Sequence, residues 1–371
     1  MRKVAVFRLK PGMKVARAVY NANQQVLLAA GTVLTSNFIK KLLQLNIPGV
    51  YIDDGLLSDV ELDDVVSEDT RNRAISYTKK IFHDFYYTRS LSGLKKMEQT
   101  VNNILEDLMN NSSLMVNLVD IRSSDEYTFG HSVNTCILSI ITGMKMGYTG
   151  KALCRLAMGA IMHDLGKTLI PAEILNKAGK LTAEEYAIVK KHTEYGYSIL
   201  TKTRRFNAVS ALIALQHHER YNGSGYPNGL TSDQIHEFSV IVGLADTYDA
   251  LTSDRVYHTA YTPYEAFEMI SAFGDYMFDF NVVKSFLHHV AAYPVGSLVK
   301  LSTGEIGAVV QNRPGYSLCP LVRILFTSEH EPLTCPAEID LASVSNVTIV
   351  KVIDNDNELN LLKFKKDSLQ R

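Results

Sequence analysis

The sequence predicts a mainly α protein, in which a long helical core is flanked by a small N-terminal α+β module and a small C-terminal β module. Apolar residues recur every three or four positions through residues 70–290, as amphipathic helices require. On both sides of this stretch, short runs rich in Val, Leu and Ile alternate with turn residues, which is typical of strands. The chain has 371 residues, 46% of them hydrophobic, and is long enough for two or three domains.

Residues 1–55 are predicted to form the N-terminal α+β module. Arg17–Gly31 has the pattern of a β-hairpin, Ser36–Leu45 that of a short amphipathic helix, and Val50–Ile52 that of a strand. These elements are too few for a large core, so we expect a small module.

Residues 56–114 are predicted to be an acidic linker followed by a helical connector. Residues 53–69 contain eight carboxylates and no Lys or Arg, a composition typical of linkers. An apolar stripe at helical spacing follows, and it indicates either a face packed on the next domain or a dimer seam. The stripe consists of Leu94, Met97, Val101, Ile104 and Leu108.

Residues 115–290 are predicted to form the helical core, and residues 291–371 a small β module with a charged tail. Two helix starts in the core carry capping boxes, with threonine at position 182 or 262 and glutamate three residues later. The strands expected in the β module are Ser297–Leu301, Ile306–Val310 and Leu321–Phe326.

Composition excludes several classes of protein. A net charge of -1 argues against a partner that is a nucleic-acid polymer. The four cysteines contain no C-x-x-C pair, which argues against a zinc ribbon and favours reduced thiols. The N-terminus lacks the apolar region of a signal peptide, and no apolar run reaches the ~18 residues of a membrane span. We therefore expect a cytoplasmic protein.

Seven potential metal ligands lie in the helical core, each within or at the end of an apolar helical segment. Together they predict a pair of metal ions, which can activate water and neutralise charge during phosphodiester hydrolysis. One carboxylate can bridge the two ions, and we assign this role to Asp164. Mixed imidazole and carboxylate ligands suit iron or manganese better than magnesium or calcium. The seven residues are His131, His163, Asp164, His192, His217, His218 and Asp246.

The context of His163-Asp164 separates it from other His-Asp and His-His pairs. It continues as Leu165-Gly166-Lys167, so a cation follows the proposed bridging ligand by three residues. This lysine could contact the scissile phosphate or assist the leaving oxygen, although it could also be a solvated lysine at a helix end. The pairs His83-Asp84 and His288-His289 lack such surroundings, and we interpret them as structural.

Three blocks in the same order resemble the HD-GYP family across residues 115–290. This family has an all-helical HD-type bundle with a metal site in its core, and its usual activity is hydrolysis of cyclic di-GMP. The resemblance implies a metal-dependent cyclic di-GMP phosphodiesterase that forms linear pGpG, GMP or both. The blocks are His163-Asp164-Leu165-Gly166-Lys167, His217-His218-Glu219-Arg220-Tyr221-Asn222-Gly223-Ser224-Gly225-Tyr226-Pro227 and Ala245-Asp246-Thr247-Tyr248-Asp249-Ala250-Leu251-Thr252-Ser253-Asp254-Arg255.

The resemblance also implies roles for individual residues. The seven residues named above are then metal ligands, and Asp164 and Lys167 are catalytic. Arg255, Asp249 and the loop Gly225-Tyr226-Pro227 are expected to contact the substrate. The loop has two further interpretations, which are compatible with the first. It could dock a diguanylate cyclase (GGDEF) domain, or serve as a tight turn that positions the His217-His218 pair.

Three positions depart from the family pattern. Tyr127 stands where three-metal members carry a glutamate, and a phenol with a pKa of ~10 is a poor ligand near pH 7. We therefore expect two metal ions and accumulation of the linear dinucleotide. Asn222 replaces an aspartate that suits the same turn, so little change is expected there. His258 replaces a basic residue, which predicts weaker or pH-sensitive substrate binding.

Two alternative functions remain open at this point. The first is an HD phosphohydrolase that acts on another nucleotide such as cyclic GMP-AMP, since the same metal ligands would serve both. The second is a non-catalytic module that binds cyclic di-GMP or a cyclase. Retention of every ligand and of Lys167 counts against the second. A homodimer is compatible with the apolar stripe but is not required by it.

Overall fold

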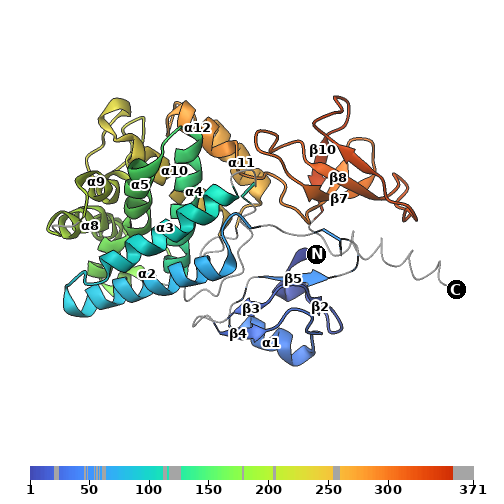
Figure 1. The fold of residues 1–371 in the computed structure, drawn as a ribbon, viewed down its shortest axis with the longest axis horizontal. Coiled ribbons are helices and arrows are strands. Elements are labelled where there is room, and N and C mark those ends of the chain that lie inside the picture. The colour runs from blue at the N-terminus through green and yellow to red at the C-terminus, as the bar shows by residue number, and fades with distance from the viewer. Residues whose placement is uncertain are drawn as a thin grey trace. The chain divides into compact units, whose positions relative to one another are not determined.

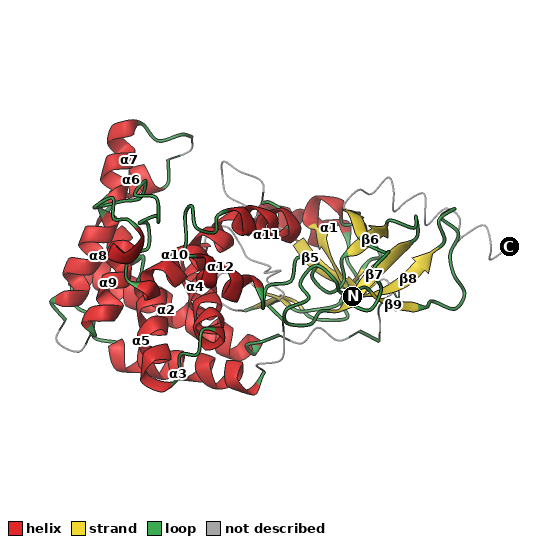
Figure 2. Ribbon diagram, turned by 90° about the horizontal axis from the view of Figure 1, so that it is seen from above, coloured by secondary structure: helices red, strands yellow, loops and turns green. Residues whose placement is uncertain are grey.

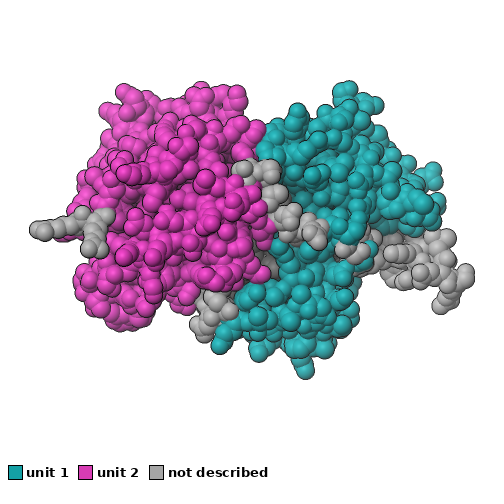
Figure 3. Space-filling view, in the orientation of Figure 1, with its two compact units in different colours: residues 1–63, 113–124, 290–371 teal, residues 64–112, 125–289 magenta. Residues whose placement is uncertain are grey.

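The computed structural model describes residues 1–20, 25–45, 47, 49–53, 55, 57, 59–60, 64–111, 115–116, 127–177, 179–203, 206–253 and 260–353. The chain divides into two units, coloured separately in Figure 3. Unit 1 comprises residues 1–63, 113–124 and 290–371, and unit 2 comprises residues 64–112 and 125–289. Within the described ranges, no helix has both the length and the apolar character needed to cross a bilayer.

Unit 2 is helical, as Figures 1 and 2 show, and this confirms the predicted mainly α class. The predicted connector helices belong to it, because α2 packs on α3 and α4, and α3 packs on α5. Its α-helices are α2 (Glu68–Thr88), α3 (Leu94–Asn110), α4 (Tyr127–Lys145), α5 (Gly150–Met162), α6 (Ala172–Leu175), α7 (Ala183–Lys190), α8 (His192–Thr201), α9 (Ala208–Gln216), α10 (Glu237–Thr252), α11 (Pro263–Ala272) and α12 (Phe280–Leu287), and short 3-10 helices cover Leu165–Leu169 (η3) and Ser232–Gln234 (η4).

Local sequence explains where several of these helices begin and which faces they bury. Both predicted capping boxes are present. The Thr182 and Thr262 side-chain oxygens accept the N–H of the residue three positions later, and the carboxylate of that residue accepts the backbone N–H of the threonine. All five residues of the apolar stripe on α3 are buried. Because α3 packs on α2, α4 and α5, the stripe is an internal packing face of unit 2.

The centre of unit 2 is formed by α4 between α5 and α10. Val133, Ile137 and Ile140 of α4 are fully buried, as are Leu156 of α5 and Leu244 of α10. Burying one such side chain contributes about 1.5–3 kcal/mol. This packing fixes the three helices that carry or directly precede four of the seven predicted ligands.

The N-terminal part of unit 1 is a small α+β module, as predicted. A three-stranded antiparallel sheet has the order β1-β5-β2, and β3 pairs with β4 in the predicted hairpin. The predicted helix is α1, whose first turn is capped by the Thr35 side chain. Strands β1 and β2 were not predicted from the sequence. The elements are β1 (Arg2–Ala5), β2 (Lys14–Val15), β3 (Val19–Tyr20), β4 (Val26–Leu28), α1 (Ser36–Gln44) and β5 (Gly49–Asp53).

The C-terminal part of unit 1 is an antiparallel sheet with the order β10-β6-β7-β8-β9. The three predicted strands are present, while β9 and β10 were not predicted. Leu57 and Val60, from the acidic segment, are buried in the apolar core of this sheet, and Arg323 of β8 pairs with Asp59 through two contacts of 2.7 and 2.8 Å. The strands are β6 (Leu298–Leu301), β7 (Ile306–Gln311), β8 (Leu321–Phe326), β9 (Glu338–Asp340) and β10 (Ile349–Val352).

Candidate metal centre

The seven predicted ligands form one cluster in unit 2, and six of them are less than a tenth exposed. They come from helices that are distant in sequence and packed together around α4 and α10. The cluster therefore depends on the tertiary fold of unit 2. His131 lies in the first turns of α4, His163 and Asp164 directly follow α5, His192 begins α8, His217 and His218 directly follow α9, and Asp246 lies within α10.

The ligand atoms fall into two neighbouring sets. In the first set, those of His131, His163 and Asp164 lie within 4.8 Å of one another, and in the second, those of the other three histidines do so. Asp164 reaches both sets, because its Oδ2 lies 3.4 Å from His163 Nε2 and its Oδ1 lies 3.5 Å from His192 Nε2. Two donor sets that share one carboxylate match the arrangement expected for a bridging ligand.

Three of the imidazoles are fixed in one tautomer by the backbone. The Nδ1 atom of His163 lies 2.6 Å from the carbonyl oxygen three residues earlier, and that of His192 lies 2.7 Å from the corresponding oxygen. The Nδ1 atom of His217 lies 3.1 Å from the carbonyl oxygens three and four residues earlier. A carbonyl can only accept, so Nδ1 carries the hydrogen and the lone pair is on Nε2. In each ring Nε2 is also the atom that approaches Asp164. The hydrogen bonds thus orient three nitrogen donors toward one point.

His131 is oriented by a carboxylate. Its Nδ1 lies 2.7 Å from Asp249 Oδ2, and its Nε2 lies 2.9 Å from Asp246 Oδ1. The other oxygen of Asp249 accepts from the Asn134 amide at 2.7 Å, and the Asn134 oxygen accepts from Arg71 of α2 at 3.1 Å. Asp249 is buried and both of its oxygens are engaged. This geometry favours a positioning role for Asp249 over the substrate contact expected from the sequence.

Burial sets the charge of most imidazoles in the cluster. It lowers the pKa of His192 to about 4, and it lowers the pKa values of His217 and His218 well below the usual range. These three rings are neutral at pH 7 and can donate a lone pair. Burial also acts against the charged form of His131, but hydrogen bonds to Asp246 and Asp249 outweigh it and raise its pKa to about 9.

The carboxylates of the cluster are ionised. Burial disfavours the charge on Asp164, but Lys167 and His163 overcome this effect and hold the pKa of Asp164 well below its usual range. The hydrogen bond and charge of His131 do the same for the pKa of Asp246. Two buried carboxylates beside the neutral rings of His192, His217 and His218 form a donor set that can hold cations.

Two buried atoms of the cluster lack hydrogen-bond partners within the described part of the chain, and this bears on whether a metal ion fits there. His163 Nε2 and Asp164 Oδ1 are buried and have no hydrogen-bond partner among the described residues. Buried polar atoms normally have partners, because leaving one unsatisfied costs free energy. One is an imidazole lone pair and the other a carboxylate oxygen, which are ordinary ligand atoms for divalent transition metals. The residues present therefore fit a divalent metal centre.

Lys167 lies beside the bridging carboxylate. Its Nζ is 2.5 Å from Asp164 Oδ2, and its side chain is about one third exposed. The preceding Gly166 allows this placement, since a Cβ there would lie 1.9 Å from the backbone oxygen of His192. Only glycine lets η3 approach α8 this closely. The lysine thus has one side toward the cluster and one side toward solvent.

The Gly225-Tyr226-Pro227 loop lies against the cluster. The Tyr226 ring stacks on His218 with a centroid distance of 4.6 Å. A Cβ on Gly225 would lie 2.4 Å from the Glu219 backbone, so this position also requires glycine. The Glu219 carboxylate accepts the N–H groups of residues 228 and 230 at 2.8 and 2.9 Å. Glu219 therefore fastens the loop to the end of α9.

Other residues discussed from the sequence have different outcomes. Arg255 and His258 lie outside the described residues, as does the side chain of Tyr127. Asn222 accepts from the N–H of Ser224 at 3.0 Å, so it forms the expected turn. His83-Asp84 is on the surface of α2.

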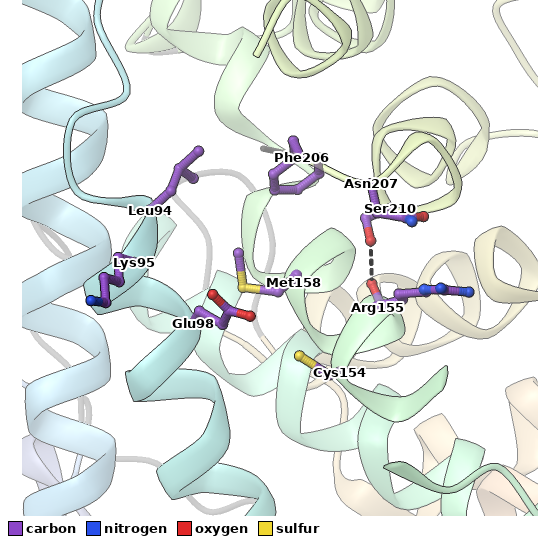
Figure 4. A pocket seen from close by; sticks show the side chains of 9 residues that line it. All are labelled: Leu94, Lys95, Glu98, Cys154, Arg155, Met158, Phe206, Asn207 and Ser210. Atoms are coloured by element: carbon purple, nitrogen blue, oxygen red, sulfur yellow. Dashed lines mark hydrogen bonds between the residues drawn. The ribbon is translucent and has the colours of Figure 1, made fainter. Parts of the chain in front are cut away.

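A separate cavity of about 370 Å³ lies among α3, α5 and the start of α9 (Figure 4). The Ser210 hydroxyl donates to the backbone oxygen of Arg155 at its edge. None of the predicted ligands lines this cavity, so it is distinct from the metal centre.

Sequence reasoning did not assign roles to Asn134 and Glu219. Asn134 lies one turn after His131 on α4, and its link to Asp249 spans 115 residues. Glu219 directly follows the His217-His218 pair and precedes a glycine-rich loop. A carboxylate at this position could have indicated from the sequence that it binds backbone N–H groups of the loop.

Comparison with known proteins agrees with this geometry. Residues 113–282 match the family model of the HD domain, and residues 298–361 match a KOW domain associated with the HD domain. A cyclic di-GMP phosphodiesterase of Pseudomonas aeruginosa is 34% identical over 62% of this chain and 55% of its own length. Another, from Borreliella burgdorferi, is 30% identical over 65% of this chain and 64% of its own length.

A third relative differs in its named substrate. A 3′3′-cGAMP-specific phosphodiesterase of Vibrio cholerae is 43% identical, over 34% of this chain and 25% of its own length. The chain thus spans less than two thirds of each of these three relatives.

The domain match covers the helices that carry the ligand cluster. The matched region also contains the Gly225-Tyr226-Pro227 loop, whose tyrosine stacks on His218. Residues 113–282 of the chain therefore match the HD domain, and the chain is similar over this region to cyclic di-GMP phosphodiesterases.

Proposed function

We propose that this protein is a metal-dependent phosphodiesterase that hydrolyses cyclic di-GMP. The carrying observation is the pair of buried ligand sets joined by Asp164, with Lys167 directly beside it. The names of the Pseudomonas and Borreliella relatives support the substrate. Bound at this cluster, two divalent ions, iron or manganese, would activate a water molecule and neutralise charge on the phosphoryl group.

The residues of this chain would divide the remaining work. Lys167 Nζ would donate a hydrogen bond to an oxygen of the scissile phosphate, while Asp164 keeps the ammonium in place. The imidazoles stay fixed through their Nδ1 hydrogen bonds. Addition of water breaks one P–O bond to a 3′ oxygen, which takes up a proton and leaves as a hydroxyl. The product of this first cut is linear pGpG.

With two ions, the second cut to GMP would be the slower one, so the linear dinucleotide would accumulate. Docking of a diguanylate cyclase domain on the Gly225-Tyr226-Pro227 loop, a homodimer and a cytoplasmic location stay predictions.

A second substrate is favoured by one observation. The Vibrio relative named for 3′3′-cGAMP is more identical to this chain than the two cyclic di-GMP enzymes, although over a shorter stretch. The two cyclic dinucleotides share their phosphates and differ in one base. The metal centre would cut both, so discrimination would depend on contacts to the bases.

Chromatography of reaction mixtures tests the proposal. The purified protein, loaded with manganese or ferrous iron under reducing conditions, is incubated with cyclic di-GMP and separately with 3′3′-cGAMP. We expect faster loss of cyclic di-GMP and appearance of pGpG. Preferential hydrolysis of 3′3′-cGAMP would replace the substrate, and no product from either, despite bound metal, would favour a binding role.

A further inference from the structure

Two residues of α7, Tyr186 and Lys190, lie beside Tyr226 and outside the ligand cluster. They lie four residues apart and therefore on the same face of the helix. The Lys190 ammonium lies 4.8 Å from the centre of the Tyr186 ring and 5.4 Å from that of Tyr226. The two rings meet edge to face at 6.3 Å. Tyr186 and Lys190 of α7 and Tyr226 of the loop thus form one surface, which we call the aromatic and cationic wall.

This wall continues directly into the metal centre. Tyr226 stacks on His218 and also lies 6.4 Å, centre to centre, from His192, which begins the helix after α7. Tyr226 therefore contacts both Lys190 and the candidate ligand His218. A molecule bound at the cluster and larger than a single phosphodiester would extend onto this wall.

Lys190 has the properties of a binding cation. Among the described residues it has no carboxylate partner, whereas Lys177 on the same side of the fold is paired with Glu185 at 2.6 and 2.7 Å. Lys190 is half-buried and Tyr186 is 46% exposed. Two aromatic faces hold the ammonium without neutralising it. The cation remains available to an anion.

Resting on the proposed function, we propose that Lys190 binds the second phosphate of the cyclic dinucleotide while the first is cut, and that Tyr186 stacks on a base. A cyclic dinucleotide carries two phosphates across one ring, so when one is at the metal centre the other must meet a different part of the protein. Lys190 supplies a positive charge for it. The Tyr186 ring supplies a flat apolar face for a purine.

The test compares two substrates. Cyclic di-GMP has a second phosphate, whereas bis(p-nitrophenyl) phosphate has one phosphodiester and needs only the metal centre. In Lys190→Met, KM for cyclic di-GMP should rise roughly tenfold, since a charge-assisted hydrogen bond is lost. Its kcat and the hydrolysis of bis(p-nitrophenyl) phosphate should stay within about twofold of wild type, because the lost interaction serves binding.

Matched variants sharpen the result. Lys191→Met removes the same charge from the exposed neighbouring residue and should leave KM unchanged. Lys190→Arg should restore most of the affinity, and Tyr186→Leu should raise KM for the dinucleotide alone. In a slow Lys167→Ala background, calorimetry should show the same tenfold loss of affinity when Lys190→Met is added.

Several results would overturn the subsite. An unchanged KM in Lys190→Met would do so, and so would an equal loss on both substrates, because that loss would reflect a damaged metal centre. A wild-type enzyme that cuts only 3′3′-cGAMP would refute the proposed substrate. The Lys190 subsite is then tested with 3′3′-cGAMP, which also has a second phosphate. KM for this compound should rise roughly tenfold in Lys190→Met. Binding of neither dinucleotide would refute both proposals.

Discussion

Asp249 forms a hydrogen bond with Nδ1 of the His131 imidazole, at a distance of 2.7 Å from its Oδ2. The opposite nitrogen of the ring faces Asp246 and the ligand cluster. A carboxylate in this position fixes the tautomer of a metal-binding histidine and increases the basicity of its donor nitrogen. The Asn134 amide and Arg71 continue the chain of hydrogen bonds to α2, so a connector helix supports a candidate ligand, His131.

The first prediction concerns this support. Asp249→Asn should lower the affinity for manganese by about 10–100-fold, because the neutral amide no longer fixes and polarises His131. Metal titration followed by calorimetry measures the change. Asp233→Asn, at an exposed position of η4, serves as the matched control and should bind metal as wild type does. Equal affinity in Asp249→Asn would show that His131 does not need its carboxylate.

The second prediction is a pH dependence of metal uptake. The folded protein raises the pKa of His131 from 6.5 to about 9, so this ion pair stabilises the fold below pH 6.5 and is lost as the pH rises through about 9. A metal ion that binds Nε2 must displace this proton. Manganese affinity should therefore rise by about tenfold per pH unit between pH 6.5 and 8. Calorimetry in buffers of different ionisation enthalpy should detect release of the proton, and a flat profile would argue against it.

The third prediction concerns the loop that covers His218. In Glu219→Gln, an amide N–H replaces one of the two oxygens that accept backbone N–H groups, which leaves a donor unsatisfied at a cost of about 1–3 kcal/mol. Hydrogen exchange of the amides in residues 223–231 should speed up roughly tenfold to hundredfold, while metal content stays the same. Glu194→Gln, at an exposed site, should leave exchange unchanged. Unaltered exchange in Glu219→Gln would mean that other contacts hold the loop.

The fourth prediction separates catalysis from metal binding. Lys167→Ala should keep both ions and lose turnover by about 10²–10³-fold, because a charge next to the phosphoryl group is removed. Metal analysis and chromatography on the same preparation measure both quantities. Loss of metal together with activity would indicate that Lys167 mainly supports Asp164.

The sequence predicted the parts of the molecule that depend on local patterns. Helix starts at Thr182 and Thr262 follow from capping chemistry, and the stripe on α3 follows from its period. Five of the seven candidate ligands lie in the three motif blocks, while His131 and His192 were assigned from their helical segments and from the resemblance. The structure brings all seven together. The role of Asp249 could not be read in this way, because its partner lies 118 residues away.

The elements that the sequence did not predict are short or depend on distant contacts. β2 has two residues and β9 has three, too few for an alternating pattern to be recognised. Leu57 and Val60 lie in a strongly acidic segment, and composition alone gives no sign that they complete the core of a sheet formed by residues about 240 positions later. Tyr186 and Lys190 look like ordinary surface residues of α7 until the fold brings Tyr226 beside them.

The most direct test of the metal centre compares two His-Asp pairs in the same chain. Asp164 reaches both ligand sets, whereas Asp84 lies with His83 on the surface of α2. Metal content and hydrolysis of cyclic di-GMP are measured for Asp164→Ala and Asp84→Ala. We predict that Asp164→Ala loses most of the bound metal and all detectable turnover, while Asp84→Ala matches wild type. Full activity in a metal-loaded Asp164→Ala protein would contradict the assignment of this cluster as the catalytic centre.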